Sequence, residues 1–325
     1  MDKLLNVSNL TVQFFLRRRQ FTAVDGVSFS LAAGERLGLV GESGAGKSVT
    51  GFAILNLVSK PGRITGGAVY FQGRDLAGLS PEKLRRVRGD RIAMIFQDPM
   101  MTLNPVLTIG TQMVETLLAH RDISRREAEE IAVEKLRRVY IPSPEKRLAQ
   151  YPHEFSGGMR QRIVIAIALL ASPALIIADE PTTALDVTIQ AEIMDLLLEL
   201  CESERMGLIL ITHDLAVVSQ VTQRIAVMYA GRIIEMGDTG RIISAPRHPY
   251  TRGLLGALPQ SGARQARLNQ IPGVMPSLFS VPPGCAFHPR CALCAPLCQE
   301  ERPRLLACGE GDFAACHCCG QEAKP

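Results

Sequence analysis

Apolar and polar residues alternate along the first part of the chain, and this pattern predicts β-strands. The segments LLNVSNLTVQF and VSFSL show the two-residue period of strands with one buried face. GERLGLVG is a short apolar run that ends in glycine, which is typical of a buried strand. GAVYFQGRDL adds a further strand and a turn. The N-terminal part is therefore expected to be built from strands.

Helical patterns follow from about residue 108 to residue 140, in a polar and charged segment. Ser124, followed by Glu127, predicts a capping box there. The apolar run IVIAIALLA (163–171) has the length of a buried helix, which Ser172-Pro173 is expected to end. A further helix is predicted from apolar residues at helical spacing, namely Ile189, Ile193, Leu196, Leu197 and Leu200.

Two more apolar runs, ALIIAD (174–179) and LILITHD (208–214), predict buried strands, and RIAVMYAGRIIEMG predicts a hairpin that turns at Ala230-Gly231. Strands that alternate with helices indicate an α/β core with a mostly parallel sheet. Beyond residue 245 proline and glycine increase and the periodicity fades. We therefore expect one domain over 1–245 and a C-terminal extension over 246–325.

Composition narrows the class of protein. The chain has 325 residues, no tryptophan and a net charge of +4, which is too small to indicate a polyanionic partner. No secretory signal is expected at the N-terminus, and the longest apolar run has about half the roughly 20 residues that a membrane span needs. A reducing compartment is therefore expected. The nine cysteines then favour metal binding over disulfides.

GESGAGKS (41–48) has the pattern of a phosphate-binding loop, and it stands between a predicted strand and a predicted helix. The glycines allow successive backbone N–H groups to converge on phosphate oxygens. Lys47 is expected to reach the β- and γ-phosphates, and Ser48 to bind Mg²⁺. The alternative is a plain glycine turn before a helix. The residues predicted to bind ATP here are Gly41, Glu42, Ser43, Gly44, Ala45, Gly46, Lys47, Ser48 and Val49.

Polar side chains follow three apolar strands. Asp179 is expected to hold Mg²⁺, and Glu180 to polarise the attacking water; the alternative for the pair is an ordinary solvated turn. His213 is expected to sense the γ-phosphate, although a lone histidine after a strand is usually structural. Gln97 follows IAMIF and is expected to reach Mg²⁺ or the water from the opposite side. Together these groups predict a nucleotide hydrolase.

With FSGGMRQR (155–162) added, the chain resembles the nucleotide-binding subunit of an ABC transporter. The resemblance covers about residues 1–245 and implies a P-loop NTPase (RecA-like) core. An antiparallel β-subdomain and a helical subdomain at about 98–160 are implied with it. Ser156, Gly157 and Gly158 open a helix and would form a second anion site. In the family this site serves the ATP of a second subunit, and Asp186 would help to seal that interface.

Longer segments narrow the resemblance. IFQDPMMTLNPVLTIG, ADEPTTALDVTIQAEI and PRHPYTRGLLGALP are similar to the ATP-binding subunits of dipeptide and oligopeptide importers. This implies a heterodimer with a homologous ATPase subunit, two integral membrane permease subunits and an extracytoplasmic peptide-binding protein. It also implies a peripheral place on the cytoplasmic face of the cell (inner) membrane. Relatives that import nickel, glutathione or cationic peptides stay open as alternatives.

A rival from another class is a soluble ABC ATPase that acts on nucleic acid or ribosomes. Such proteins usually carry two cassettes or long insertions, and neither is present here. Nucleic acid is therefore not expected as a partner. For the adenine ring, the family implies an aromatic residue ahead of the phosphate loop. Phe21 is the candidate, with core packing as its alternative.

The tail carries eight of the cysteines. Its spacing resembles a family site for a 4Fe-4S cluster, with Cys285, Cys291, Cys298 and Cys316 as the implied ligands. Four thiolates also suit Zn²⁺, and free reduced thiols are the third possibility. The ligand assignment stays open because further cysteines depart from the family spacing, namely Cys294, Cys308, Cys318 and Cys319. A metal centre would stabilise an extension that has little core of its own.

Overall fold

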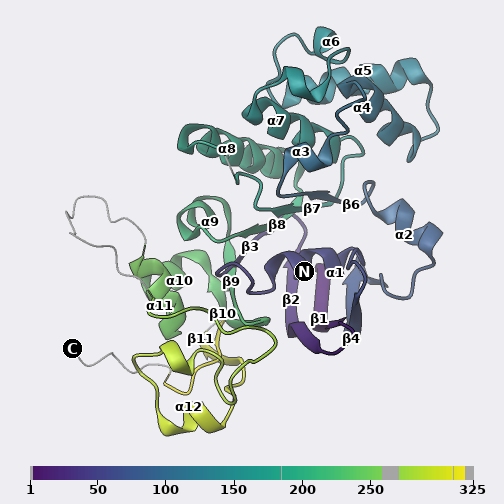
Figure 1. The fold of residues 1–325 in the computed structure, drawn as a ribbon. Helices are drawn as coiled ribbons and strands as arrows, with labels where there is room; N and C mark the ends of the chain where they lie inside the picture. The colour runs from purple at the N-terminus through teal and green to yellow at the C-terminus, as the bar shows by residue number, and fades with distance from the viewer. Residues whose placement is uncertain (1–2, 184, 258–270, 310, 319–325) are drawn as a thin grey trace. The chain divides into compact units, whose positions relative to one another are not determined.

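The computed structural model describes residues 3–183, 185–257, 271–309 and 311–318 (Figure 1). Cys319, one of the tail cysteines, lies outside the described residues. The chain forms two compact units. The first contains residues 78–209 with two short N-terminal pieces, and the second contains residues 5–31, 36–77 and the chain from residue 210 onward. Each unit therefore joins segments that are distant in sequence.

An antiparallel sheet in the second unit has the strand order β2-β1-β4-β5. Its strands are β1 (Lys3–Phe15), β2 (Gln20–Ala32), β4 (Gly62–Phe71) and β5 (Arg74–Asp75). In the β1–β4 pairing Leu5 lies opposite Phe71, and Val7 lies opposite Val69. These four side chains are buried, as the alternating pattern requires. The predicted N-terminal strands are thus present.

A second sheet runs through the second unit in the order β11-β12-β10-β9-β3. Its strands are β3 (Arg36–Val40), β9 (Arg224–Tyr229), β10 (Arg232–Asp238), β11 (Leu306–Gly309) and β12 (Asp312–Ala314). β3 and β9 pair in parallel, whereas β9 and β10 form the predicted hairpin. The extension joins this sheet because β12 pairs with β10, with Phe313 opposite Met236. These last strands are too short to show a period in the sequence.

In the first unit, β6 (Ile92–Ile95) and β7 (Leu175–Asp179) pair in parallel, and the first residues of the buried strand β8 (Gly207–Thr212) follow. The helices α3 to α7 pack against one another (Figure 1). Ser124 caps α5 by accepting a hydrogen bond from the Glu127 amide at 3.2 Å. The helices of this unit are α2 (Pro81–Val87), α3 (Pro99–Thr102), α4 (Ile109–Leu118), α5 (Arg125–Arg138), α6 (Pro144–Arg147), α7 (Gly157–Ala168) and α8 (Val187–Glu204).

The predicted buried helix is longer at its start than the apolar run, because α7 begins at Gly157, and it ends at Ala168, ahead of Ser172-Pro173. The second unit has short helices, which are α1 (Lys47–Ile54), α9 (Leu215–Val221), α10 (Thr239–Ser244), α11 (Pro249–Gly256) and α12 (Pro296–Glu300). Single 3-10 turns lie at Pro152–Glu154 and His288–Arg290. Within the described ranges, no helix combines the length and the apolar character that crossing a bilayer requires.

A buried histidine, His248, lies near the start of the extension. His248 is 1% exposed, and its Nδ1 accepts a hydrogen bond from the Tyr250 amide at 3.0 Å, which begins α11. Its own amide donates to the Glu235 carboxylate at 3.0 Å. Burial lowers the pKa of His248 to about 3. Burial also raises the pKa of Glu235. The imidazole is therefore neutral in the folded protein at neutral pH.

Replacement of His248 with Asn is expected to reduce the acid sensitivity of folding. The unfolded chain protonates His248 near pH 6.5, whereas the folded chain does so only near pH 3, so the unfolded state binds more protons in between. The His248 contribution to the free energy of unfolding thus falls by up to ~1.4 kcal/mol per pH unit as pH drops below 6.5. The raised pKa of Glu235 acts with the opposite sign in both proteins. The check is denaturant unfolding of the wild type and the variant from pH 7.5 to 4.5; identical slopes would contradict the expectation.

Candidate functional site

The phosphate loop (41–48) links β3 to α1 and is held in a tight turn. Gly44 and Gly46 have φ angles of +83° and +103°, a region that other residues rarely adopt. Lys47 is only 4% exposed, and its Nζ donates to the carbonyl oxygens of Gly41 at 2.8 Å and Glu42 at 3.0 Å. The ammonium is therefore fixed across the loop, at the N-terminus of α1. A positive side chain there, beside a helix N-terminus, suits a bound phosphate.

The strand β2 and the β9–β10 turn contact the phosphate loop closely. The Gly231 amide, in the β9–β10 turn, donates to the Ala45 carbonyl at 2.9 Å. A Cβ on Gly46 would lie 2.5 Å from the Ala23 carbonyl oxygen of β2. Thr50, one turn into α1, donates from its hydroxyl to the Gly46 carbonyl at 2.9 Å. Only glycine fits at position 46, for steric as well as for conformational reasons.

Glu42 connects the loop to the extension. Its amide donates to the Tyr250 hydroxyl at 2.9 Å. Its carboxylate accepts hydrogen bonds from the two terminal nitrogens of the Arg290 guanidinium, with Nη1–Oε2 at 2.9 Å and Nη2–Oε1 at 3.1 Å. Sequence reasoning did not single out Tyr250 or Arg290. Both lie within segments that carry the family resemblance, PRHPYTRGLLGALP and PPGCAFHPRC, and this was the available signal.

In the first unit, the structure brings Gln97 and Glu180 together. Gln97 Nε2 donates to Glu180 Oε2 at 3.0 Å, and the Thr183 hydroxyl donates to the same oxygen at 2.9 Å. The parallel pairing of β6 and β7 explains the contact, because both residues follow the ends of these strands. Glu180 has a φ of +45°, an uncommon conformation that clusters at functional sites. Asp179, the last residue of β7, is 3% exposed.

Two helix N-termini lie close together in the same unit. Ser156 caps α7 by accepting from the Met159 amide at 3.4 Å, and Asp186 caps α8 by accepting from the Ile189 amide at 3.0 Å. A Cβ on Gly158, in the first turn of α7, would lie 2.7 Å from Ile189 Cγ2 of α8. The absence of a side chain at Gly158 thus allows the close approach of the two helices. Free amides at a helix N-terminus favour an anion.

Phe21 and His213 belong to the second unit. His213 directly follows β8 and is exposed. The Phe21 ring stacks on Phe14 at 5.1 Å and 6°, and it contacts Phe279 of the extension at 4.6 Å. Phe21 is therefore in aromatic packing, and its stacking on adenine stays a prediction. Ser48 also lies in this unit, whereas Gln97 and Asp179, the other predicted Mg²⁺ ligands, lie in the first.

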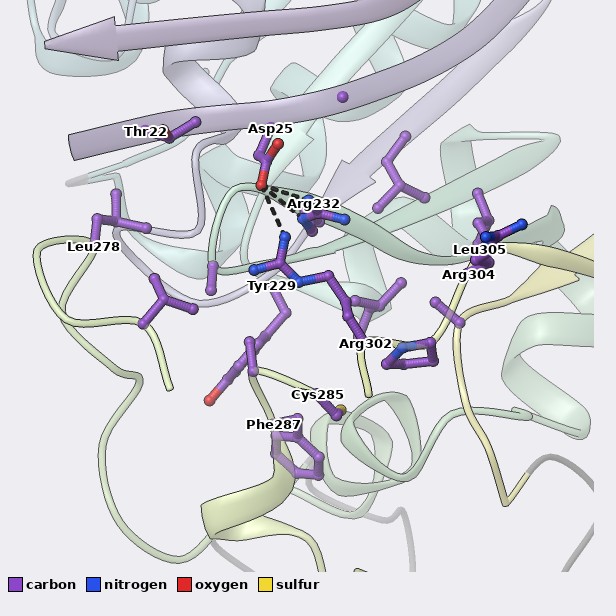
Figure 2. A pocket seen from close by; sticks show the side chains of 18 of the residues that line it. Thr22, Asp25, Tyr229, Arg232, Leu278, Cys285, Phe287, Arg302, Arg304 and Leu305 are labelled. Carbon is purple, nitrogen blue, oxygen red and sulfur yellow. Dashed lines mark hydrogen bonds and ion pairs between the residues drawn. The ribbon is translucent and has the colours of Figure 1, made fainter. Parts of the chain in front are cut away.

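Phe21 lines a cavity of about 790 Å³ between β1, β2, the β9–β10 hairpin and the extension. Figure 2 shows the ion pairs on its wall. Asp25 Oδ2 accepts from Arg232 at 2.6 Å and 2.8 Å, and Arg302 of the extension reaches the same oxygen at 3.4 Å. The extension is thus tied to β2 as well as to the phosphate loop.

The tail cysteines gather around a separate small cavity. The Cys285 amide donates to the Cys298 carbonyl at 2.8 Å, and the Cys291 amide donates to the His288 carbonyl at 3.2 Å. The cysteines in the described ranges form no disulfides. The side chains that line this cavity, called the cysteine cavity below, include Cys285, Cys291, Cys298, Cys316, Cys318, His248, His288 and His317. The four implied ligands thus share one cavity, which Cys318 also lines.

The thiols of the cysteine cavity have the ligand chemistry that zinc and iron–sulfur clusters use. Burial raises the pKa of Cys285 and Cys291, and a bound cation would act in the opposite direction. Among the residues that the structure describes, no group of three or more His, Cys, Asp or Glu side chains is arranged to hold a metal ion. The cysteines of the cavity are therefore the right kind of ligand for zinc or an iron–sulfur cluster, but in the described residues they are not arranged as a coordination shell.

Comparison with known proteins identifies the family. Residues 24–183 match the family described as "ABC transporter", and residues 234–298 match "Oligopeptide/dipeptide transporter, C-terminal region". The chain is 48% identical over 314 residues to the "Dipeptide transport ATP-binding protein DppD" of Escherichia coli (strain K12), covering 97% of this chain and 96% of that protein. The chain belongs to the ATP-binding proteins of ABC transporters. The resemblance seen in the motifs is thereby confirmed.

Other ABC proteins support the same assignment. The "Probable peptide ABC transporter ATP-binding protein y4tR" of Sinorhizobium fredii is 50% identical over 317 residues, with 97% of this chain and 95% of that protein covered. The ADP- and Pi-bound dimer of the ATP-binding cassette MJ0796 is 28% identical with a TM-score of 0.65, over 72% of this chain and 98% of that chain. The expected P-loop NTPase fold and the class of ABC-type ATPase are therefore confirmed.

Replacement of Gly46 with Ala in this ABC ATPase is expected to be severely destabilising. The new Cβ would meet a backbone oxygen at 2.5 Å and would force an L-residue into a φ of +103°. Together these effects are expected to lower the free energy of unfolding by about 2–5 kcal/mol. Gly73→Ala is the matched control, because Gly73 also has a positive φ but no atom within 4 Å of its Cβ position, and it should cost only about 1–2 kcal/mol. Equal losses in denaturant titrations would refute the steric argument.

Proposed function

We propose that this chain is the ATP-hydrolysing, energy-coupling subunit of an ABC importer for dipeptides or oligopeptides. One observation carries this proposal: the chain is 48% identical to a dipeptide transport ATP-binding protein along 97% of its length. The match of residues 234–298 to an oligopeptide/dipeptide transporter region supports the same class of cargo. In this proposal residues 1–245 form the ATP-binding part, with the helical subdomain at about 98–160, and residues 246–325 form the extension.

The phosphate loop binds the triphosphate of ATP in this proposal. The left-handed glycines and the fixed ammonium of Lys47 support this role, because they present N–H groups and a positive charge together. Ser48, Gln97 and Asp179 would hold Mg²⁺, which supplies charge neutralisation at the β- and γ-phosphates. Phe21 is the proposed neighbour of adenine.

Glu180 is the proposed general base for hydrolysis. Its Oε2 accepts hydrogen bonds from Gln97 and Thr183, and this fixes the carboxylate as a base requires. The carboxylate polarises a water molecule and accepts its proton as the water oxygen bonds to the γ-phosphorus. The bond from the γ-phosphorus to the β–γ bridging oxygen breaks in the same step, so that ADP and phosphate are released. His213 then stabilises the γ-phosphate by hydrogen bonding. Phosphoryl transfer depends on such positioning more than on covalent chemistry.

A second ATPase subunit completes each site. Ser156, Gly157 and Gly158, with Asp186 beside them, would bind the γ-phosphate of the ATP that the other subunit holds. The two different ATPase subunits would form a heterodimer that binds two integral membrane permease subunits. An extracytoplasmic peptide-binding protein would deliver the peptide to these permease subunits. The chain would then be peripheral, on the cytoplasmic face of the inner membrane. Coupling would pass through residues 98–160, where the exposed side chains of Met100, Met101 and Val106 follow Gln97.

The cysteine cavity holds a 4Fe-4S cluster in this proposal, with Zn²⁺ as the alternative. The gathering of several cysteines around one small cavity supports it, because these cysteines are not joined in disulfides. Cys285, Cys291 and Cys298 would be ligands, and Cys316 would complete the set. The bound group would stabilise the fold of the extension, because the hydrophobic core of the extension is small. No step of ATP hydrolysis requires this group.

Replacement of Glu180 with Gln is expected to separate ATP binding from hydrolysis. Gln keeps the shape of the side chain but cannot accept a proton, so turnover should fall about 100-fold or more while ATP affinity stays within about threefold. The measurement is ATP turnover and ATP affinity of the assembled subunit pair. Glu129→Gln, on the exposed surface of α5, is the control and should behave as wild type. Unchanged turnover would remove Glu180 as the base, and retained ATP binding in Lys47→Ala would contradict the phosphate-loop assignment.

The identity of the bound group can be checked by colour and metal content. Protein purified without oxygen should be brown, because thiolate-to-iron charge transfer absorbs visible light. It should also contain iron and sulfide in equal molar amounts, because the proposed cluster holds four of each. Cys291→Ser should lose this colour, whereas Cys308→Ser, which lies outside the cysteine cavity, should keep it. Colourless protein with bound zinc would select the alternative, and protein without either metal would refute the metal centre.

A further inference from the structure

The strongest contact between the extension and the phosphate loop is the Arg290–Glu42 ion pair. Both oxygens of the Glu42 carboxylate are taken, at 2.9 Å and 3.1 Å. The Arg290 side chain is only 6% exposed, so water weakens this pair little. A bidentate pair of this kind fixes orientation as well as distance. The carboxylate of Glu42 is therefore held in one direction.

Arg290 is itself held from several sides. Its Nε donates to the Pro272 carbonyl at 2.8 Å, and its Nη1 approaches the Tyr229 hydroxyl at 3.4 Å. The guanidinium carbon lies 5.9 Å from the ring centres of both Tyr229 and Phe287. The guanidinium is thus a rigid support rather than a mobile surface group.

Glu42 in turn carries three contacts within the phosphate loop and next to it. Its carbonyl accepts from Lys47 Nζ at 3.0 Å and from the Ala45 amide at 3.2 Å, and its own amide donates to Tyr250. A rotation of the Glu42 peptide would disturb the lysine and the turn at once. The grip of Arg290 on the Glu42 side chain therefore restrains the peptide groups that shape the loop.

Residues on both sides of Arg290 in the chain line the cysteine cavity, namely His288 and Cys291. Arg290 belongs to the single turn His288–Arg290, whose two flanks are Cys285–Phe287 and Cys291. The His288 amide and its Nδ1 both contact the Cys285 carbonyl, at 3.0 Å and 2.9 Å. Phe287 is 3% exposed and packs on Tyr229 and Tyr250. The backbone that orients Arg290 is thus built between two cysteines of the cavity.

We propose that Arg290 is a positioning residue for ATP binding, and that the cysteine-lined turn sets the nucleotide affinity of the phosphate loop through it. This inference rests on the proposed role of the loop in binding ATP. In this proposal Arg290 acts through the Glu42 carboxylate that it holds. Loss of order around Cys285 and Cys291 would release Arg290 and weaken ATP binding without any change at Glu180, the proposed general base.

The test compares ATP affinity and turnover in the full chain. Arg290→Met keeps much of the side-chain volume but removes the charge and the two parallel hydrogen bonds to Glu42. The dissociation constant for MgATP should then rise about tenfold, while turnover at saturating ATP should fall less than threefold. Arg290→Lys keeps one charge without these two parallel hydrogen bonds, so the rise should be about threefold. Arg302→Met is the matched control, because Arg302 also ties the extension to the cassette, at Asp25, and it should change affinity less than twofold (Figure 2). If Arg290→Met does not fold by circular dichroism, Arg290→Lys carries the comparison.

A double-mutant cycle tests the link to the cysteines. Cys291→Ser should weaken ATP binding about as much as Arg290→Met, and the double variant should be no weaker than either single variant, because both changes remove the same support. Multiplicative effects would overturn the link to the cysteine cavity. Wild-type affinity in Arg290→Met, with Lys47→Ala binding no ATP, would overturn the role of Arg290 and leave the proposed function intact. ATP binding unchanged in Lys47→Ala would instead refute the proposed function.

Discussion

The backbone conformation of the phosphate loop is the constraint on which the nucleotide site of this protein depends. Left-handed φ angles at Gly44 and Gly46 turn the chain so that its amides point inward, and Lys47 closes the turn from within. β2 and the β9–β10 turn then press against the loop so closely that no side chain fits at position 46. Contacts within the chain therefore fix the shape of the loop, and a fixed loop loses less conformational entropy on binding.

In the first unit, the ends of two parallel strands bring polar and acidic residues together. β6 and β7 lie side by side in the first unit, so the residues that follow them meet although they are distant in sequence. Gln97 and Thr183 both donate to one oxygen of Glu180, and the left-handed conformation of Glu180 shows that the surrounding structure determines its direction. The same unit places the α7 and α8 N-termini together. Strand pairing, hydrogen bonds and the close helix contact thus fix the positions of these groups.

The C-terminal extension is part of the nucleotide-binding unit. It adds β12 to the edge of β10, places Phe287 in an aromatic cluster with Tyr229 and Tyr250, and carries Arg290 to the phosphate loop. Its own regular structure is sparse, so its order depends on these contacts and on the cysteine cavity. The extension thus connects the state of its cysteines to the ATP affinity of the phosphate loop, because Cys291 and Arg290 belong to the same short turn and its flank.

The sequence by itself determined the phosphate loop, the polar residues at the strand ends, the β9–β10 hairpin and the family. Each of these depends on neighbours within a few positions, through backbone preference, capping or two-residue alternation. Only the tertiary structure decided that Arg290 meets Glu42, 248 positions away, that Cys318 lines the cavity with the implied ligands, and that short strands of the tail extend the sheet. Such contacts form between side chains whose local sequence carries no period or spacing, so their partners are set by how the whole chain packs and not by any segment alone.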